Sequence, residues 1–203
     1  MKDTSTDYIF KILTLGNSQV GKTSLLLRFT ENKFVDNNLA TIGIDVQVKT
    51  INYKGKKIEL QLWDSAGQEK YRSLSRQFYS RAQGIILVYD ITSKESFTAL
   101  KQWLKDIHTN LANQPNMILV GKKTDLKSAV DKADVIEFTK ELNIPLFLTS
   151  ALTGEGIENA MNSLIEIMFE DIVKGKKKYS HSQVSGSFHI KQKKKSEKEP
   201  CNC

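Results

Sequence analysis

Apolar residues along this chain recur at two spacings, one typical of strands and one typical of helices. A β-rich apolar segment that ends at Gly16 predicts a strand over Tyr8–Leu15. Alternation predicts a hairpin, in which Ile44–Tyr53 is followed by a Lys54-Gly55-Lys56 turn and a second strand from Ile58. Short apolar runs predict buried parallel strands at 84–90, 117–121 and 145–149. Helical spacing covers 22–30, 94–111, 131–142 and 157–173. The predicted fold is α/β, with a six-stranded, mostly parallel sheet that has one antiparallel edge strand and helices on both faces.

The charge is divided unevenly along the 203 residues, and this division predicts two regions. The net charge is +7, and residues 174–203 hold nine lysines and two glutamates, which account for all of it. Residues 1–173 carry 21 basic and 21 acidic side chains. We therefore expect a neutral folded domain at 1–173 and a disordered, polybasic tail at 174–203. A basic groove for nucleic acid is not expected on the domain.

The positions of the cysteines and the lack of a long apolar run predict the cellular compartment. Cys201 and Cys203 are the only cysteines, which excludes a disulfide framework and a cysteine-ligated zinc site. The longest purely apolar run, Ile85–Tyr89, is far too short to span a bilayer. The polar N-terminus is followed by no long apolar stretch, so no signal peptide is expected. The expected location is the cytoplasm.

Residues Gly16 to Thr23 read GNSQVGKT and match G-x-x-x-x-G-K-[ST] between a predicted strand and a predicted helix. Glycines at these positions let backbone N–H groups and the helix N-terminus face a phosphate. Lys22 would neutralise the β- and γ-phosphates, and the Thr23 hydroxyl would bind Mg²⁺. The motif predicts a P-loop for a nucleoside triphosphate and does not specify the base.

Two further segments fit the same chemistry. Asp64 ends the second hairpin strand and could hold the Mg²⁺ from the opposite side, while Gly67 could donate its N–H to the γ-phosphate and Gln68 could orient the attacking water. Thr41 lies in a polar loop, where its hydroxyl could complete the metal shell only when the γ-phosphate is present. From the sequence alone, Thr41 could equally be an ordinary loop threonine.

Two loops that follow predicted strands could recognise a base. Lys123-Thr124-Asp125 supplies a carboxylate that can accept from the N1–H and the exocyclic amino group of guanine, a donor pair that adenine lacks. Ser150-Ala151-Leu152 could give a backbone N–H to guanine O6. Both loops belong at the carboxyl edge of the sheet, where open α/β folds bind ligands.

These segments, in this order, resemble a Ras-superfamily small GTPase, and IGID, KKIELQLWDSAGQE, FYSRAQGIILVYDIT and the Cys-x-Cys at the end of the sequence resemble its Rab branch. The resemblance implies GTP or GDP and Mg²⁺ as cofactors, with Thr23, Thr41 and Asp64 as the metal residues. It implies that Phe34 packs on the guanine, that Lys123 lies along the base, and that Lys22 and Gln68 serve catalysis. The implied nucleotide residues are Ser18, Gln19, Val20, Gly21, Lys22, Thr23, Ser24, Phe34, Thr41, Gly67, Lys122, Lys123, Asp125, Ser150, Ala151 and Leu152.

The sequence departs from the family pattern at two positions that matter for the nucleotide. Lys122 stands where the family has Asn in Asn-Lys-x-Asp, an amide that contacts guanine N7 and braces the base loop against the P-loop. We expect weaker guanine binding and faster release, with guanine preference retained through Asp125. Gln19 replaces a frequent Gly, and a side chain there is expected to crowd the γ-phosphate or the attacking water.

The resemblance also implies a route to membranes. It predicts geranylgeranylation of Cys201 and Cys203, since two chains, or one chain plus a polybasic patch, hold a protein on a bilayer. The tail lysines would add attraction to an anionic leaflet. The partners implied are an exchange factor, a GTPase-activating protein, a prenylation escort or dissociation inhibitor, and membrane-traffic effectors. We expect a monomer that cycles between the cytosol and the cytosolic face of an intracellular membrane.

The favoured function is a GTP-hydrolysing switch with slow intrinsic turnover, because no arginine is placed to act on the γ-phosphate. A nucleotide-regulated binding scaffold without hydrolysis is the alternative that Gln19 and Lys122 favour. A nucleotide kinase is a third possibility. It is disfavoured because the sequence shows no arginine-rich lid and no obvious domain for an acceptor nucleotide.

Overall fold

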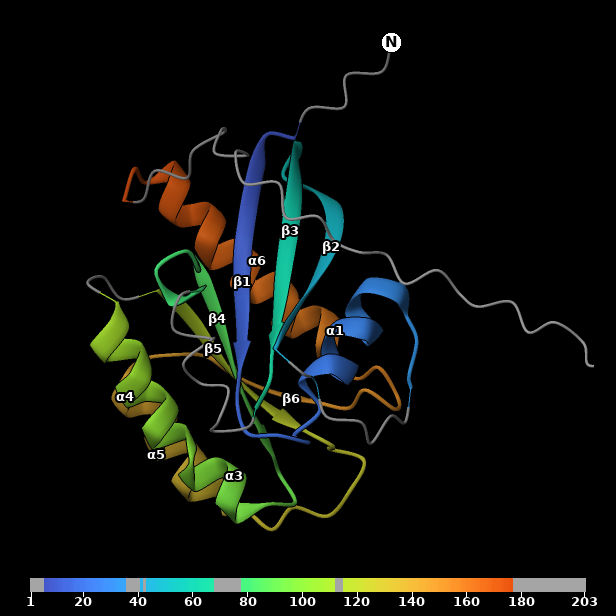
Figure 1. Cartoon of the computed structure of the whole chain (residues 1–203), viewed down its shortest axis with the longest axis vertical. Coiled ribbons are helices and arrows are strands. Elements are labelled where there is room, and N and C mark those ends of the chain that lie inside the picture. Colours follow the sequence, from blue (N-terminus) through green and yellow to red (C-terminus); the bar gives the residue numbers. More distant parts are fainter. Residues whose placement is uncertain (1–5, 36–40, 42, 68–77, 112–114, 177–203) are drawn as a thin grey trace, which may run out of the picture.

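The computed structural model describes residues 6–35, 41, 43–67, 78–111 and 115–176, and these form a twisted sheet between two layers of helices (Figure 1). The sheet contains β1 (Tyr8–Leu15), β2 (Ile44–Tyr53), β3 (Lys56–Ser65), β4 (Gly84–Asp90), β5 (Asn116–Lys122) and β6 (Leu146–Thr149) in the order β2-β3-β1-β4-β5-β6. Only the β2–β3 pair is antiparallel. The predicted fold class is confirmed.

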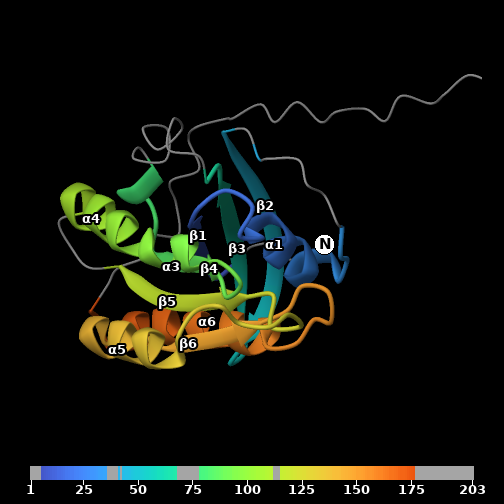
Figure 2. The same ribbon diagram turned by 90° about the horizontal axis from the view of Figure 1, so that it is seen from below.

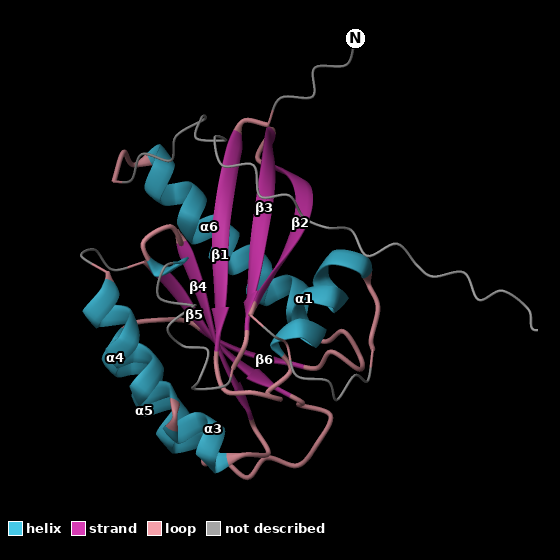
Figure 3. Ribbon diagram, viewed as in Figure 1, coloured by secondary structure: helices cyan, strands magenta, loops and turns pink. Residues whose placement is uncertain are grey.

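Strand alternation divides the core into two layers. In β1, Phe10 and Ile12 face one cluster of buried side chains, and Leu13 and Leu15 face the other. The first cluster is covered by α1 (Lys22–Glu31) and α6 (Ile157–Val173); the second includes side chains of α4 (Leu100–Asn110) and α5 (Lys132–Leu142) (Figure 3). Because side chains point alternately to opposite faces of a strand, an apolar run such as β4 fills both layers at once.

The predicted helix at 94–111 is wrong in one respect, because the chain forms α3 (Lys94–Thr98) and then α4. Ser93 caps α3, with its hydroxyl accepting from the Ser96 N–H at 3.1 Å. The Thr98 hydroxyl donates to the Lys94 carbonyl at 3.0 Å. Ala99, between the two helices, has helical dihedrals (φ −65°, ψ −16°), and its N–H donates to the Glu95 carbonyl at 2.9 Å, so the interruption is confined to a single residue.

The carboxyl ends of the parallel strands gather at one edge, which points down in Figure 1 and toward the viewer in Figure 2. The pairing places Thr14 beside Asp64, Asp90 beside Lys122, and Lys122 beside Thr149. Loops that follow these strands therefore share one end of the molecule, and this end carries the predicted chemistry. Among the described residues, no helix combines the length and the hydropathy needed to cross a bilayer.

Candidate active site

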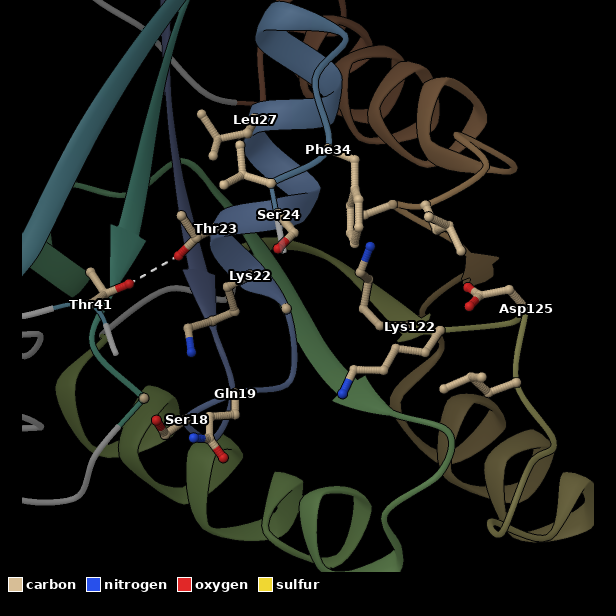
Figure 4. A pocket seen from close by; sticks show the side chains of 17 residues that line it. Ser18, Gln19, Lys22, Thr23, Ser24, Leu27, Phe34, Thr41, Lys122 and Asp125 are labelled. Atoms are coloured by element: carbon tan, nitrogen blue, oxygen red, sulfur yellow. Dashed lines mark hydrogen bonds between the residues drawn. The ribbon is translucent and has the colours of Figure 1, made fainter. Parts of the chain in front are cut away.

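A cavity of about 450 Å³ lies at the carboxyl edge of the sheet (Figure 4). Fourteen of the predicted residues line it: Ser18, Gln19, Gly21, Lys22, Thr23, Ser24, Phe34, Thr41, Gly67, Lys122, Lys123, Asp125, Ala151 and Leu152. Leu27, Val35 and Leu126, which sequence reasoning did not identify, complete the lining. Figure 4 shows Thr23 and Thr41 on one side, Asp125 on the other, and Lys22 and Lys122 between them.

The loop from Gly16 to Gly21 forms the turn that its motif predicts. Gly16 has φ +150°, and a Cβ there would lie 2.2 Å from the carbonyl oxygen of Val88, so only glycine lets the loop pass this close to β4. Gly21 has φ +93° at the start of α1. Val20 is buried in the core rather than lining the cavity, so any role of Val20 toward a ligand falls to its backbone.

The Lys22 ammonium lies inside this loop. Its Nζ donates to the carbonyl oxygens of Gly16 at 3.0 Å and Asn17 at 2.8 Å. Burial lowers the pKa of Lys22 to about 8, against the opposing effect of the Asp64 carboxylate. The loop therefore positions a buried cation beside backbone groups, which suits a polyanionic ligand.

Three oxygen atoms from separate segments meet next to this cation. The Thr23 hydroxyl lies 2.5 Å from Asp64 Oδ2 and 2.9 Å from the Thr41 hydroxyl, and Thr41 lies 3.4 Å from Asp64 Oδ2. Burial raises the pKa of Asp64, opposed mainly by the Thr23 hydrogen bond and the charge of Lys22. Asp64 Oδ1 is buried without a hydrogen-bond partner in the described part of the chain. Hydroxyl and carboxylate oxygens with a lone pair to spare fit a hard cation such as Mg²⁺.

Gly67 lies directly against the phosphate-binding loop. A Cβ at Gly67 would lie 2.2 Å from the carbonyl carbon of Asn17, so a larger residue would force the two segments apart. Gln68 lies outside the described residues. Gln19, with φ +64°, borders both this cavity and a second, polar cavity of about 430 Å³ that reaches Ser93 and Glu95. The predicted effect of Gln19 on hydrolysis stays a prediction.

The opposite end of the cavity brings the predicted base-binding residues together. Phe34 is 39% exposed at the rim, where a flat ligand could pack on its ring. Asp125 accepts a 2.5 Å hydrogen bond from the Ser150 hydroxyl, and Ser150 is fully buried behind the cavity. The Ser150 N–H donates to the Glu155 carbonyl at 3.1 Å, which leaves Ala151 and Leu152 as the backbone donors for a ligand.

Two adjacent lysines at this end differ in their partners. Lys123, in the left-handed region with φ +67°, forms a 2.5 Å ion pair with Asp90. Burial alone would raise the pKa of Asp90, but hydrogen bonds from Lys123 and Thr92 outweigh it and lower the pKa. Lys122 is 1% exposed, and its Nζ has no hydrogen-bond partner among the described residues.

Arg28 also organises the base end, and sequence reasoning missed it. Its guanidinium donates to the carbonyl oxygens of Ala151 at 2.7 Å and Leu152 at 2.8 Å, and to that of Asn32 at 3.1 Å. Arg28 thus joins the last turn of α1 to the loop after β6. On the sequence it is one polar position of an amphipathic helix, and no local signal separates it from a solvent-exposed side chain.

Asn17 makes a second contact that the sequence does not reveal, a hydrogen bond with Trp103. Its side-chain oxygen accepts from the buried Trp103 indole at 3.0 Å, which ties the phosphate-binding loop to α4.

Comparison with known proteins agrees with this geometry. A model of the Ras family matches residues 11–170. The chain is 43% identical over 169 residues to Ras-related protein SEC4 of Saccharomyces cerevisiae, an alignment that covers 83% of this chain and 79% of the yeast protein. It is 44% identical over 160 residues to Ras-related protein Rab-1D of Dictyostelium discoideum, covering 78% of each chain.

Proposed function

This chain belongs to the Ras family, and from that premise we propose that it works as a Rab-like GTPase switch in membrane traffic. Like its family, it binds GTP and GDP with Mg²⁺, hydrolyses GTP, and is controlled by regulators and read by effectors. The observation that carries the assignment to this cavity is the meeting of Thr23, Thr41 and Asp64 beside the buried Lys22.

In this proposal the cavity holds the nucleotide with its phosphates at the Lys22 end and its base at the Asp125 end. Asp125 accepts from the donor edge of guanine, Phe34 packs on the ring, and Ala151 or Leu152 donates a backbone N–H. The hydrogen bond from Ser150 that orients Asp125 supports this assignment. Mg²⁺ would be held by Thr23, Thr41 and Asp64, and when bound it neutralises phosphate charge.

The reaction is the transfer of the γ-phosphoryl group of GTP to water. A water oxygen bonds to the γ-phosphorus, the bond to the β–γ bridging oxygen breaks, and GDP leaves with the electron pair while the proton passes to phosphate. Lys22 stabilises charge on the β- and γ-phosphates, the Gly67 N–H bonds a γ-phosphate oxygen, and Gln68 orients the water. Turnover without a GTPase-activating protein is slow.

Single-turnover cleavage of GTP by the purified full-length chain tests this function. The wild type is expected to release GDP and phosphate from GTP and not from ATP. Gln68→Leu should abolish most of the cleavage while leaving GTP bound, and Gln102→Leu, an exposed glutamine on α4, should behave as the wild type. Tight GTP binding without cleavage would favour the scaffold alternative. Transfer of the γ-phosphoryl group to an added nucleoside monophosphate, which gives GDP and a second nucleoside diphosphate without free phosphate, would favour the kinase.

We further propose that residues 1–173 are the GTPase domain and that 174–203 form a membrane-attachment tail. Cys201 and Cys203 would carry isoprenoid groups, and an escort protein or dissociation inhibitor would shield them in the cytosol. The lysine-rich composition of the tail supports this assignment. The test is fractionation of cells expressing Cys201→Ser/Cys203→Ser, which should be lost from membranes, with Asn202→Ser as the matched control. Membrane retention of the cysteine variant would refute lipid attachment.

A further inference from the structure

Trp103 is a fully buried side chain of α4 whose polar atom is directed at the phosphate-binding loop. Its indole N–H donates to the side-chain oxygen of Asn17 at 3.0 Å. An indole nitrogen donates and cannot accept, so the Asn17 amide presents its oxygen, and not its amino group, to α4. The ring of Trp103 belongs to the core cluster that contains side chains of α4 and α5, and close packing fixes it there. The hydrogen bond therefore anchors one residue of the loop to the core.

The backbone of Asn17 is where two parts of the proposed catalytic machinery meet. Its carbonyl oxygen accepts from the Lys22 ammonium at 2.8 Å. A Cβ on Gly67 would lie 2.2 Å from the Asn17 carbonyl carbon and 2.3 Å from the Ser18 nitrogen, so Gly67 lies directly on the peptide group between them. A displacement of Asn17 therefore also displaces the cation and the residue that bonds the γ-phosphate in the proposed function.

The loop borders open space on the side that faces α3. Asn17, Ser18 and Gln19 line the polar cavity of about 430 Å³ that reaches Ser93 and Glu95. Because packed side chains do not fill this space, they do not hold the loop in place on that side. The directional bond from the Trp103 indole to the Asn17 oxygen supplies a constraint that packing does not.

We propose that Trp103 is a positioning residue for GTP cleavage. It does not line the nucleotide cavity, and it acts through Asn17, which holds Lys22 and Gly67 in place for the γ-phosphate. GDP has no γ-phosphate, so the same hydrogen bond matters much less for GDP binding. This inference rests on the proposed function, and it makes the arrangement of the catalytic residues depend on a side chain of α4.

Single-turnover cleavage of bound GTP by the full-length protein tests the inference. Trp103→Phe keeps an aromatic ring in the core without the N–H, and it should slow cleavage by about 10-fold. Its affinity for Mg²⁺-GDP, measured by calorimetric titration, should stay within about threefold of the wild type. Ile107→Val is the matched control, because Ile107 lies one turn further along α4 in the same buried cluster and has no hydrogen-bonding side chain. The control should cleave GTP at the wild-type rate.

A double-mutant cycle shows whether Trp103 acts through Asn17. Asn17→Leu has a similar size and no acceptor, and it leaves the core around α4 intact. If the hydrogen bond carries the effect, Asn17→Leu and the double variant Trp103→Phe/Asn17→Leu should each slow cleavage by the same factor as Trp103→Phe. Effects that multiply would show that the two residues act separately, and they would overturn the inference. If Trp103→Phe does not fold, Asn17→Leu decides alone, and an unchanged cleavage rate in that variant would overturn the inference.

The remaining outcomes distinguish the inference from the proposed function. Wild-type protein that cleaves no GTP would refute the proposed function, and the inference with it. Normal cleavage by both Trp103→Phe and Asn17→Leu would refute the role of Trp103 alone. A loss of GDP affinity as large as the loss of cleavage rate would mean that the hydrogen bond only keeps the loop folded, and it would also overturn the inference.

Discussion

Replacing Lys122 by Met is expected to stabilise the nucleotide-free protein. The pKa of Lys122 falls from 10.5 to about 8 on folding because the side chain is buried. At about 1.4 kcal/mol per pH unit, keeping this ammonium charged costs the folded protein on the order of 3 kcal/mol at pH 7. Met has a similar length and no charge, so it removes the cost without opening a large cavity.

The pH dependence of this stability difference gives the sharper test, because the lowered pKa of Lys122 determines whether the difference grows or shrinks as the pH rises. Below pH 8 the lysine is charged in both the folded and the unfolded chain, and the full cost is present. Between pH 8 and 10.5 the unfolded chain binds more protons, so the wild type gains stability as the pH rises and Lys122→Met lacks that gain. The difference in unfolding free energy between Lys122→Met and the wild type should therefore decrease by about 1.4 kcal/mol from pH 7 to pH 9.

Urea unfolding of both proteins at pH 7 and pH 9 measures this difference in unfolding free energy. The m-values of the two proteins are compared to exclude a change in the unfolded state. Lys22 also has a pKa of about 8, but it is present in both proteins and cancels in the difference. A Lys122→Met variant that is less stable than the wild type at pH 7, or a gap that does not narrow, would refute the reasoning.

Four further substitutions probe the contacts around the nucleotide. Lys122→Asn restores the amide of the family pattern and should slow GDP release by roughly 5- to 150-fold, so unchanged release in a fluorescent-nucleotide chase would contradict the expected effect of this departure. Arg28→Lys loses the planar fork that holds the Ala151 and Leu152 carbonyls and should speed GDP release by about 10-fold in the same assay, whereas an effect confined to stability would argue against it. Gly67→Ala pushes its segment off Asn17 and should slow single-turnover GTP cleavage by roughly 100-fold with GDP affinity little changed; normal cleavage would show that the segment moves away before the reaction. Asn17→Ala removes the acceptor of the Trp103 indole and should lower the unfolding free energy by about 1 kcal/mol, read from the urea midpoint; an unshifted midpoint would show that the bond contributes nothing.

The elements that the sequence predicted well are those with an unambiguous local pattern. β1, β2 and β4 have the predicted bounds because alternation and apolar runs determine which residues can face a core. The interruption at Ala99 was missed because the helical spacing of the apolar residues Phe97, Leu100 and Leu104 continues across it.

The residues of the candidate site likewise fall into those that a local sequence pattern predicts and those that only the packing of distant segments brings together. The phosphate-binding motif places Lys22 and Thr23 within one continuous segment, so spacing alone predicts their arrangement. Arg28 meets the Ala151 carbonyl 123 positions further along the chain, and only the packing of α1 against the loop after β6 creates that contact. The sequence identified Lys122 as unusual, but only the folded structure shows that its Nζ is buried with no hydrogen-bond partner among the described residues.

Helix α1 connects the two ends of the cavity. It begins at Lys22, next to the phosphate-binding loop, and Arg28 in its last turn donates hydrogen bonds to the loop after β6. Ten helical residues at 1.5 Å each make a rod of about 15 Å that resists bending. A partner that pulls on the base loop therefore also displaces the phosphate-binding loop. We therefore expect that a partner bound at the base loop also weakens the contacts of the phosphate-binding loop with the nucleotide.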